Sequence, residues 1–358
     1  MQTLIGITFD KLRQLLQQNK FSVQLKHIPK VLFLTVLSIR NSRLRKKEQR
    51  QFSEALQKVS IEQNPVFILG HWRSGTTLLH KLMALDKQFN FPTVFQIYNP
   101  NSLLYLEPRL RAKLENIPEQ KRPMDNMTIR FDDPGEEEFA VSVTSLKSQV
   151  LGWVFPKNIS YYDRYLTFND VNPVEIELWQ ASLLLILKKL TLRNPKPLLL
   201  KSPQNTGRIK ELLELFPKAK FIHLHRHPYA IFRSTLKLYR ETVSRFYLQQ
   251  YNDSGLEEEI INRYVRMYDA FFEERALLSD NQYYELGFEE FEQDPLRYLE
   301  EIYRRLDLPA FDVAKPCFVE YLARIKNYKK NIYQEKKPWQ EKVAEAWQKS
   351  FSEWNYQK

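Results

Sequence analysis

A stretch near residue 70 combines glycines, hydroxyls and one cation at a spacing that suits phosphate binding. Residues 66–83 read VFILGHWRSGTTLLHKLM, with an apolar run before Gly70 and an apolar helical pattern after Gly75. Glycines let backbone N–H groups turn toward a ligand, and the N-terminus of a helix adds a partial positive charge. The sequence therefore predicts a strand, a phosphate-binding loop and a helix, in that order.

The loop departs from the pattern that binds metal-bound nucleoside triphosphates. That pattern is G-x-x-x-x-G-K-S/T, in which the lysine contacts the β- and γ-phosphates. Here Gly70, Gly75 and Thr77 fit the pattern, but Thr76 occupies the lysine position. The cation is Arg73, inside the loop. We therefore expect a phosphate ligand other than a triphosphate with bound magnesium.

Two further cations end predicted strands. Residues 197–203 and 220–228 have the pattern of buried strands, and they contain Lys201 and Arg226 near their ends. A helical pattern lies between them, so the strand–helix–strand order predicts a parallel sheet. Because ligands of such sheets bind at the carboxyl ends of the strands, we expect Arg73 and these two cations to form one anion site. Neither strand ends in the aspartate that helps an NTPase hold magnesium.

The composition limits the class of protein and the compartment. The 358 residues suffice for one large α/β domain with insertions, or for two domains. Cys317 is the single cysteine, so no internal disulfide can form. Because the whole chain has only this cysteine and six histidines, we expect no structural zinc site. No apolar stretch is long enough for a membrane span, and the N-terminus lacks the apolar core of a signal peptide. We expect a cytoplasmic protein, at the inner face of the membrane if it is membrane-associated.

The charge distribution favours anionic partners. The formal net charge is +11, which suits phosphorylated small molecules, anionic lipid or nucleic acid. Residues 31–39 are mostly apolar, and a basic run follows over residues 40–50. This order is compatible with peripheral contact with an anionic membrane through the N-terminal region. The alternative is a helix packed on the core, followed by a solvated basic helix.

The pattern along the chain predicts an α/β protein with helical extensions at both ends. Residues 1–60 are expected to be a helical extension, and residues 61–310 a three-layer P-loop domain with a central parallel sheet flanked by helices. Residues 91–170 are rich in proline and aromatic residues and are expected to be a substrate-binding insertion. Asn172-Pro173 predicts the start of a helix that ends near Arg193. Residues 311–358 are expected to be a C-terminal extension of helices and loops.

Several motifs, in one consistent order, resemble an enzyme family. Arg73-Ser74-Gly75-Thr76-Thr77 is similar to the 5′-phosphosulfate loop of sulfotransferases that use 3′-phosphoadenosine 5′-phosphosulfate (PAPS). Arg226 with Ser234, eight residues later, is similar to their 3′-phosphate motif. The chain resembles the bacterial group of this family that is related to tyrosylprotein sulfotransferases. Further motifs that fit this group lie at residues 122–126, 134–140, 201–203, 215–219 and 288–295.

The resemblance implies an enzyme that moves a sulfuryl group from PAPS to a hydroxyl or an amine and releases PAP, with no metal. Arg73 and Lys201 are implied as catalytic, because fixed cations at the bridging oxygen stabilise the departing nucleotide. Arg226 and Ser234 are implied to bind the 3′-phosphate. The loop is implied to bind the 5′-phosphate through Gly70, His71, Trp72, Arg73, Ser74, Gly75, Thr76 and Thr77.

The acceptor needs a general base, and the sequence leaves its identity open. Pro203 stands where cytosolic sulfotransferases have a histidine, and Gln96 stands where tyrosylprotein sulfotransferases have a glutamate. The acidic cluster that follows Pro134 is the best source, although a solvated helix start is the structural alternative. Side chains two apart on a helix point in different directions, so we expect only one of Glu136 and Glu138 to reach the site, and Glu136 is the favoured one. The other candidates are Asp132, Asp133 and His71.

Three classes of function follow from these features. The first is a PAPS-dependent sulfotransferase with a small-molecule, lipid or carbohydrate acceptor, and the basic N-terminus favours lipid. The second is a P-loop kinase or NTPase, and the third is a non-enzymatic binder of anionic lipid or nucleic acid. We expect no nucleic-acid partner, and the sequence predicts no oligomeric state.

Two aromatic patterns have simpler structural explanations than ligand binding. His223, His225 and His227 alternate on a predicted strand and could share a face as metal ligands do, but we expect no metal there. A tail with interleaved lysines could stack on nucleic acid, but we expect it to pack across the substrate region. Its aromatic residues are Tyr328, Tyr333 and Trp339.

Overall fold

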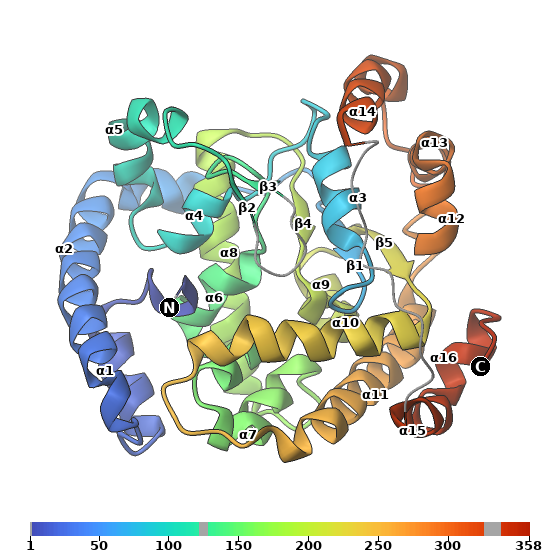
Figure 1. The fold of residues 1–358 in the computed structure, drawn as a ribbon. Helices are drawn as coiled ribbons and strands as arrows, with labels where there is room; N and C mark the ends of the chain where they lie inside the picture. Colours follow the sequence, from blue (N-terminus) through green and yellow to red (C-terminus); the bar gives the residue numbers. More distant parts are fainter. Residues whose placement is uncertain (1, 122–127, 326–337) are drawn as a thin grey trace. The chain divides into compact units, whose positions relative to one another are not determined.

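Figure 1 shows the fold of the protein in a computed structural model, which describes residues 2–121, 128–325 and 338–358. The motif at residues 122–126 and the tail residues Tyr328 and Tyr333 lie outside the described residues. The described residues form an α/β fold with a central parallel sheet flanked by helices, as the sequence predicts.

The chain forms two compact units, each assembled from separate stretches. One contains the parallel sheet and is called the sheet unit, and the other is mainly helical and is called the helical unit. The division expected from the sequence, into residues 1–60, 61–310 and 311–358, follows chain order and stays a prediction. The sheet unit comprises residues 64–89, 199–238 and 254–358, and the helical unit comprises residues 1–63, 90–198 and 239–253.

The sheet unit is built on four parallel strands in the order β4-β1-β5-β6. They are β4 (Leu199–Lys201), β1 (Val66–Leu69), β5 (Lys220–His225) and β6 (Tyr283–Gly287). All four residues of β1 are buried, since this strand is covered on both faces. The chain passes from β1 to β4 on one side and then to β5 on the other, so the strand order reverses at β1. Ligands of open α/β sheets bind at such a reversal, which places the loop after β1 at the expected position.

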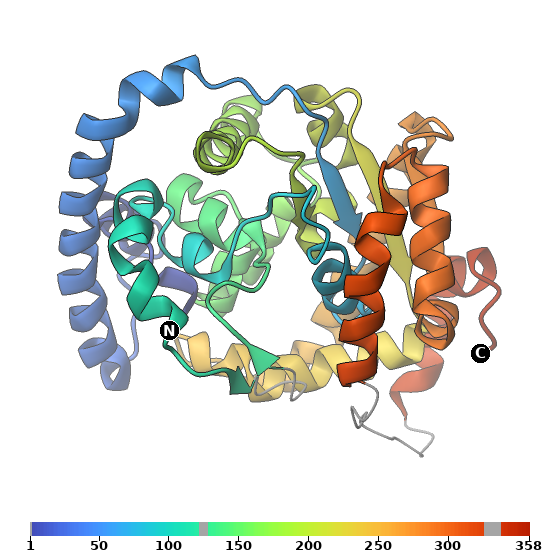
Figure 2. The ribbon, with the colours of Figure 1, turned by 90° about the horizontal axis from the view of Figure 1, so that it is seen from above.

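Helices of the same unit pack around this sheet. Helices α12 and α13, drawn in orange in Figure 2, contact β6, and α13 contacts α14. Helix α3 follows β1 and contacts β1 and β4, while α11 contacts α9 and α15. The helices of this unit are α3 (Thr76–Met83), α9 (Ile209–Leu215), α10 (Pro228–Glu241), α11 (Leu256–Glu274), α12 (Phe288–Gln293), α13 (Pro295–Arg305), α14 (Phe311–Ile325), α15 (Trp339–Ala346) and α16 (Gln348–Glu353).

The segment after β4 differs from the sequence prediction. The predicted strand over residues 197–203 is only β4, and the helix predicted between the two strands begins at Ile209. Between them lies a buried 3-10 turn, Pro203–Gly207. Proline has no N–H for a sheet hydrogen bond, so Pro203 cannot extend the strand ladder. The turn also brings the Thr206 hydroxyl to the backbone N–H of Gly70, at 2.8 Å.

The helical unit contains the mainly helical N-terminus that the sequence predicts and the short helices expected over residues 91–170. Its small two-stranded sheet pairs β2 (Gln120–Lys121) with β3 (Thr128–Ile129) in antiparallel register. The helices are α1 (Phe9–Gln18), α2 (Ile28–Lys58), α4 (Val94–Tyr98), α5 (Leu103–Glu115), α6 (Glu137–Ser145), α7 (Ile159–Asp163) and α8 (Pro173–Arg193).

Helix α8 confirms the predicted helix from Pro173 to Arg193. The Asn172 side chain accepts a hydrogen bond from the N–H of Val174 at 3.0 Å, which satisfies one of the free donors at the helix start. Glu175 in the first turn pairs with Arg164 at 2.7 Å and with Lys147. A carboxylate near the positive end of a helix dipole also stabilises the helix.

None of the helices in the described part of the chain combines the length and the apolar composition that a bilayer crossing requires.

Candidate active site

The loop between β1 and α3 is closely packed and depends on its two glycines. Gly70 has φ of +142°, and a Cβ atom there would lie 2.5 Å from the carbonyl oxygen of Leu224. Gly75 has φ of +99° and directly precedes α3, and a Cβ there would lie 2.1 Å from the Phe288 ring. Positive φ disfavours residues with a side chain, so both positions require glycine. Arg73 also has positive φ, at 73°, which makes the loop a tight turn.

Hydroxyl groups lie at the base of this loop. The Thr206 hydroxyl accepts the N–H of Gly70 at 2.8 Å and fixes the first residue of the turn. Ser74 is fully buried, its N–H donates to the carbonyl of His71, and its hydroxyl has no hydrogen-bond partner among the described residues. Buried polar atoms are normally hydrogen-bonded, so an unpartnered hydroxyl in a phosphate-type loop is suited to a ligand oxygen.

Two of the three predicted cations, Arg73 and Arg226, meet at this loop. The Nε–H of Arg73 donates to the Ser234 hydroxyl at 2.9 Å, and Nη1 of Arg226 donates to the carbonyl of Arg73 at 3.1 Å. The Arg226 guanidinium lies over the Phe288 ring, 4.4 Å from its centroid. Its Nε is buried and has no hydrogen-bond partner in the described part of the chain. Three predicted residues, Arg73, Arg226 and Ser234, therefore form one connected cluster.

Burial changes the electrostatics of this cluster. Desolvation lowers the pKa of Arg226 below its usual range, although Glu289 and Glu292 partly oppose that effect. Arg73 adds to the lowering, because two cations close together repel each other. A dianionic ligand would compensate for the cost of desolvation and reduce the repulsion between the two cations, so the cluster suits an anion.

Lys201 lies at the end of β4, the strand next to β1, where its backbone pairs with Ile68. Its side chain is buried. Burial and the charge of Lys201 together hold the pKa of His80, on α3, well below its ordinary value, which keeps the His80 ring neutral.

His71 lies inside the loop but is unsuited to act as the general base. Its ring is buried against Trp72 and Tyr264, and Nδ1 contacts the carbonyl oxygen of Trp72 at 2.9 Å. Burial and the nearby Arg263 charge lower the pKa of His71 to about 3, despite the Trp72 carbonyl. A group with so low a pKa accepts protons poorly at neutral pH.

The acidic candidates belong to the helical unit. Glu136 is half-buried at the N-cap position of α6, and its side chain makes no capping hydrogen bond. Glu138, two residues later, is buried, and its Oε1 accepts a hydrogen bond from the Ser148 hydroxyl at 2.6 Å. Glu137 is also buried, so the solvated helix start considered as an alternative does not describe this cluster.

The two aspartates before this helix take part in local contacts. Asp132 pairs with the Nε of Arg130 at 2.9 Å, and Asp133 accepts the N–H of Arg130 at 3.0 Å. Gln96, where a relative's glutamate would stand, forms a capping box with Thr93 at the start of α4. These three side chains therefore have structural roles that the sequence did not reveal.

Each of the three alternating histidines contacts another protein group, and for His227 the Nδ1 atom accepts the N–H of Tyr229 at 3.3 Å. His223 Nδ1 lies 2.7 Å from Glu285, and His225 Nδ1 lies 2.9 Å from the Tyr356 hydroxyl. The ring of His225 stacks on Trp354, with 4.7 Å between centroids. No group of three metal-ligating side chains occurs among the described residues.

The sequence did not predict the roles of two residues that shape the site. Thr206 holds the start of the loop, and Phe288 contacts both the Gly75 position and Arg226. Phe288 lies in the motif at residues 288–295, but the sequence pattern does not show what its ring packs against.

In the C-terminal tail, Trp339 packs on Phe232, with 4.8 Å between ring centroids.

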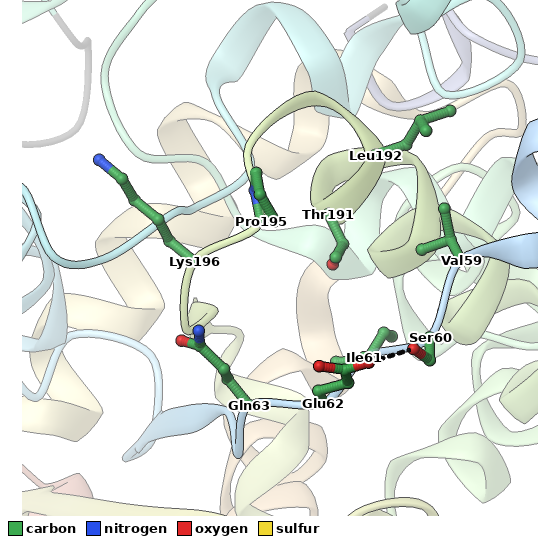
Figure 3. A pocket seen from close by; sticks show the side chains of 9 residues that line it. All are labelled: Val59, Ser60, Ile61, Glu62, Gln63, Thr191, Leu192, Pro195 and Lys196. Atoms are coloured by element: carbon green, nitrogen blue, oxygen red, sulfur yellow. Dashed lines mark hydrogen bonds between the residues drawn. The ribbon is translucent and has the colours of Figure 1, made fainter.

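A separate pocket lies in the helical unit, shown in Figure 3. Its volume is about 330 Å³, and none of the predicted site residues lines it. We therefore assign no catalytic role to it. It is lined by Val59, Ser60, Ile61, Glu62, Gln63, Thr191, Leu192, Pro195 and Lys196.

Comparison with known proteins decides the family. Residues 65–312 match the model of the Sulfotransferase family, which is more than half of the chain. The chain belongs to the Sulfotransferase family. It is a sulfotransferase enzyme, and the family predicted from the loop and the Arg226–Ser234 pair is confirmed.

Curated relatives and solved structures agree with this assignment. The chain is 34% identical to the omega-hydroxy-beta-dihydromenaquinone-9 sulfotransferase Stf3 of Mycobacterium tuberculosis and of Mycobacterium bovis, over 92% of this chain and 85% of theirs. The crystal structure of sulfotransferase STF1 from Mycobacterium tuberculosis has a TM-score of 0.67 and 20% identity, over 96% of this chain and 93% of that chain. Sulfotransferase STF9 from Mycobacterium avium also has a TM-score of 0.67, with 17% identity over 98% of this chain and 97% of that chain. The last two similarities concern the fold.

Proposed function

We propose that this sulfotransferase moves a sulfuryl group from PAPS to a hydroxyl on a lipid-like acceptor. The observation that carries the proposal is the cluster of Arg73, Arg226 and Ser234 around a glycine loop that lacks the NTP-binding lysine. This donor set suits two separate phosphate-type groups better than a magnesium triphosphate.

The described residues fit a nucleotide with a 3′-phosphate and a 5′-phosphosulfate. The Ser74 hydroxyl and Arg226 Nε have no hydrogen-bond partner among the described residues, and Gly70 and Gly75 allow the tight turn that surrounds the Ser74 hydroxyl. We assign the 5′-phosphate to residues 70–77 and the 3′-phosphate to Arg226 and Ser234. PAPS, when bound, supplies an activated sulfuryl group.

Arg73 and Lys201 are proposed to stabilise the charge that develops on the leaving side. Arg73 follows the central strand β1, and Lys201 ends the adjacent strand β4. Both side chains are held by the surrounding structure before any ligand arrives, Lys201 by burial and Arg73 by its bond to Ser234. Preorganised donors of this kind need little rearrangement as charge develops.

Glu136 is proposed to accept the proton of the acceptor hydroxyl. Its half-buried carboxylate is more accessible than that of Glu138, which is buried and bound by Ser148. His71, the candidate within the loop, has a pKa lowered to about 3 and is enclosed by aromatic rings. These observations support Glu136 among the candidates left open by the sequence.

The proposed acceptor class follows from the curated relatives. Stf3 is named for an omega-hydroxylated dihydromenaquinone, and this chain aligns with 85% of its length. A hydroxyl on a similar lipid-like molecule is therefore the acceptor that we propose. If this assignment fails, an acceptor assay should instead show sulfuryl transfer to a carbohydrate or to a small alcohol.

Thermal unfolding in EDTA tests the nucleotide assignment. A ligand that binds only the folded state stabilises it by about 2.7 kcal/mol at 100 times its Kd. PAP in EDTA should raise the unfolding temperature, and ATP with magnesium should not. A rise with magnesium-ATP alone would move the function to a kinase or NTPase, and no rise with either would indicate a different donor.

A further inference from the structure

Helix α2 exposes a set of large apolar side chains on one face. Leu32 is 62% exposed and Val36 is 70% exposed, whereas Leu34 between them is 1% exposed. Figure 2 shows α2 running along one side of the helical unit. Single exposed apolar residues are common on protein surfaces, but a contiguous group indicates an interaction site.

The spacing places these residues together. Ile28, Leu32, Val36 and Ile39 follow one another at intervals of four, four and three residues, which is one face of an α-helix. With a rise of 1.5 Å per residue, this apolar stripe is about 16 Å long. The segment before α2 extends the stripe, because Leu25 is 80% exposed there. We call the residues Leu25, Ile28, Leu32, Phe33, Val36 and Ile39 the α2 apolar stripe.

Contacts on the opposite side of α2 fix this orientation. The Asn41 side chain donates to the carbonyls of Ile5 and Ile7, at 2.7 and 2.9 Å. The buried Glu48 pairs with Lys189 of α8 at 2.7 Å. Because these polar groups are satisfied inside the unit, α2 cannot rotate to bury the apolar stripe without breaking buried hydrogen bonds.

Exposed cations continue the same face beyond Ile39. No acidic residue occurs between Asp10 and Glu48 in the sequence, and Glu48 points inward to Lys189. The face therefore changes from apolar to basic along the helix axis without any negative charge to balance it. The exposed basic residues of this half are Arg40, Arg43, Lys46, Lys47 and Arg50.

We propose that this face of α2 binds the surface of an anionic lipid membrane. Apolar side chains that enter the boundary between headgroups and acyl chains, next to cations that contact anionic headgroups, are the features of interfacial helices. A second copy of the chain is a poor occupant, because residues 11–47 contain no acidic side chain that could pair with the cations of this face. The proposal is independent of the proposed sulfuryl transfer, since it requires no nucleotide.

Co-sedimentation with lipid vesicles tests this surface. The full chain should sediment with vesicles of phosphatidylglycerol and phosphatidylcholine, sediment far less with phosphatidylcholine alone, and lose binding as salt is raised. The double variant Leu32→Glu with Val36→Glu should reduce the partition coefficient at least about tenfold, through lost apolar burial and added repulsion.

A matched control separates the stripe from a general effect of charge. Val174 and Leu178 on α8 are 59% and 51% exposed and also lie four residues apart. Changing both to Glu adds the same charge and should leave most of the binding intact. Equal loss in the two double variants, or salt-independent wild-type binding, would overturn the proposal. A dimer in light scattering that Leu32→Glu with Val36→Glu converts to monomer would also overturn it, because a second copy would then cover the stripe.

Discussion

At the residue scale, side chains from three separate segments meet around one loop. Arg73 bonds to Ser234, and Arg226 bonds to the backbone of Arg73. The sequence could predict that these residues would gather, because cations at the carboxyl ends of parallel strands converge. It could not predict the bond between Arg73 and Ser234, which depends on the positive φ of Arg73 and on where α10 lies.

Arg226→Ala and Ser234→Ala should weaken PAP binding more than binding of adenosine 5′-phosphosulfate, which has no 3′-phosphate. Hydrogen bonds to charged groups contribute about 1.5–3 kcal/mol, so the PAP Kd should rise roughly 10- to 100-fold. Calorimetry with both ligands measures the difference. Arg266→Ala, at an exposed position of α11, is the control and should bind like the wild type. Equal weakening of both ligands would show that the pair does not recognise the 3′-phosphate.

Glu136→Gln should lower turnover while leaving PAP affinity nearly unchanged. The change keeps the shape of the side chain and removes its basicity, and a positioned base typically contributes about 100- to 10,000-fold in rate. Steady-state kinetics and PAP titration on the same preparation separate the two effects.

Glu138→Gln is the matched control for that variant. Its amide oxygen can still accept the Ser148 hydroxyl, so turnover should stay close to that of the wild type. If Glu138→Gln is inactive and Glu136→Gln is normal, the base is Glu138. Normal turnover in both variants would remove the acidic cluster from the mechanism.

At the element scale, the strand–loop–helix unit is the part that the sequence predicted best. Glycine positions, an apolar run and a helical pattern are local signals, and α8 was also predicted from its Asn172-Pro173 start. Strand β4 is shorter than predicted, because Pro203 begins a turn that serves the loop. Strand β6 was not predicted, since its residues Tyr283–Gly287 are only partly buried and lack an apolar run.

Gly75→Ala should destabilise the protein and abolish PAP binding. A left-handed backbone costs a residue with Cβ about 1–2 kcal/mol, and overpacking against Phe288 adds about 1–3 kcal/mol. Denaturant unfolding measures the loss. Gly255→Ala is the matched control, because nothing lies within 4 Å of a Cβ at that position, and it should change stability by about 1 kcal/mol or less. Wild-type stability and PAP affinity in Gly75→Ala would contradict the loop geometry.

The contact between β5 and β6 should make stability depend on acidity. Burial alone would raise the pKa of Glu285, but hydrogen bonds from His223 and Tyr283 lower it to about 2. A lowered folded-state pKa stabilises the protein above the ordinary value of 4.5, and the benefit disappears as the pH falls toward 2. The difference in unfolding free energy between wild type and Glu285→Gln should be on the order of 3 kcal/mol at pH 7. It should shrink below pH 4.5, and a constant difference down to pH 2 would contradict the assignment.

At the scale of the whole molecule, the family and the fold class could be predicted, but the division into units could not. The sheet unit and the helical unit each combine three stretches of chain, and sequence patterns report neighbours along the chain rather than packing. The nucleotide-binding candidates belong to the sheet unit and the acidic candidates to the helical unit. The apolar run before the basic segment was visible in the sequence, but only the structure distinguishes exposed Leu32 from buried Leu34.

Sulfuryl transfer from radiolabelled PAPS tests the central claim most directly. The purified protein should label an omega-hydroxylated dihydromenaquinone in EDTA, and Arg73→Ala should lower the rate by about 100-fold or more, as for loss of a preorganised donor. Arg266→Ala should retain the wild-type rate. Transfer of radiolabelled phosphate from ATP, with no transfer from PAPS to this lipid or to any component of a lipid extract, would contradict the account.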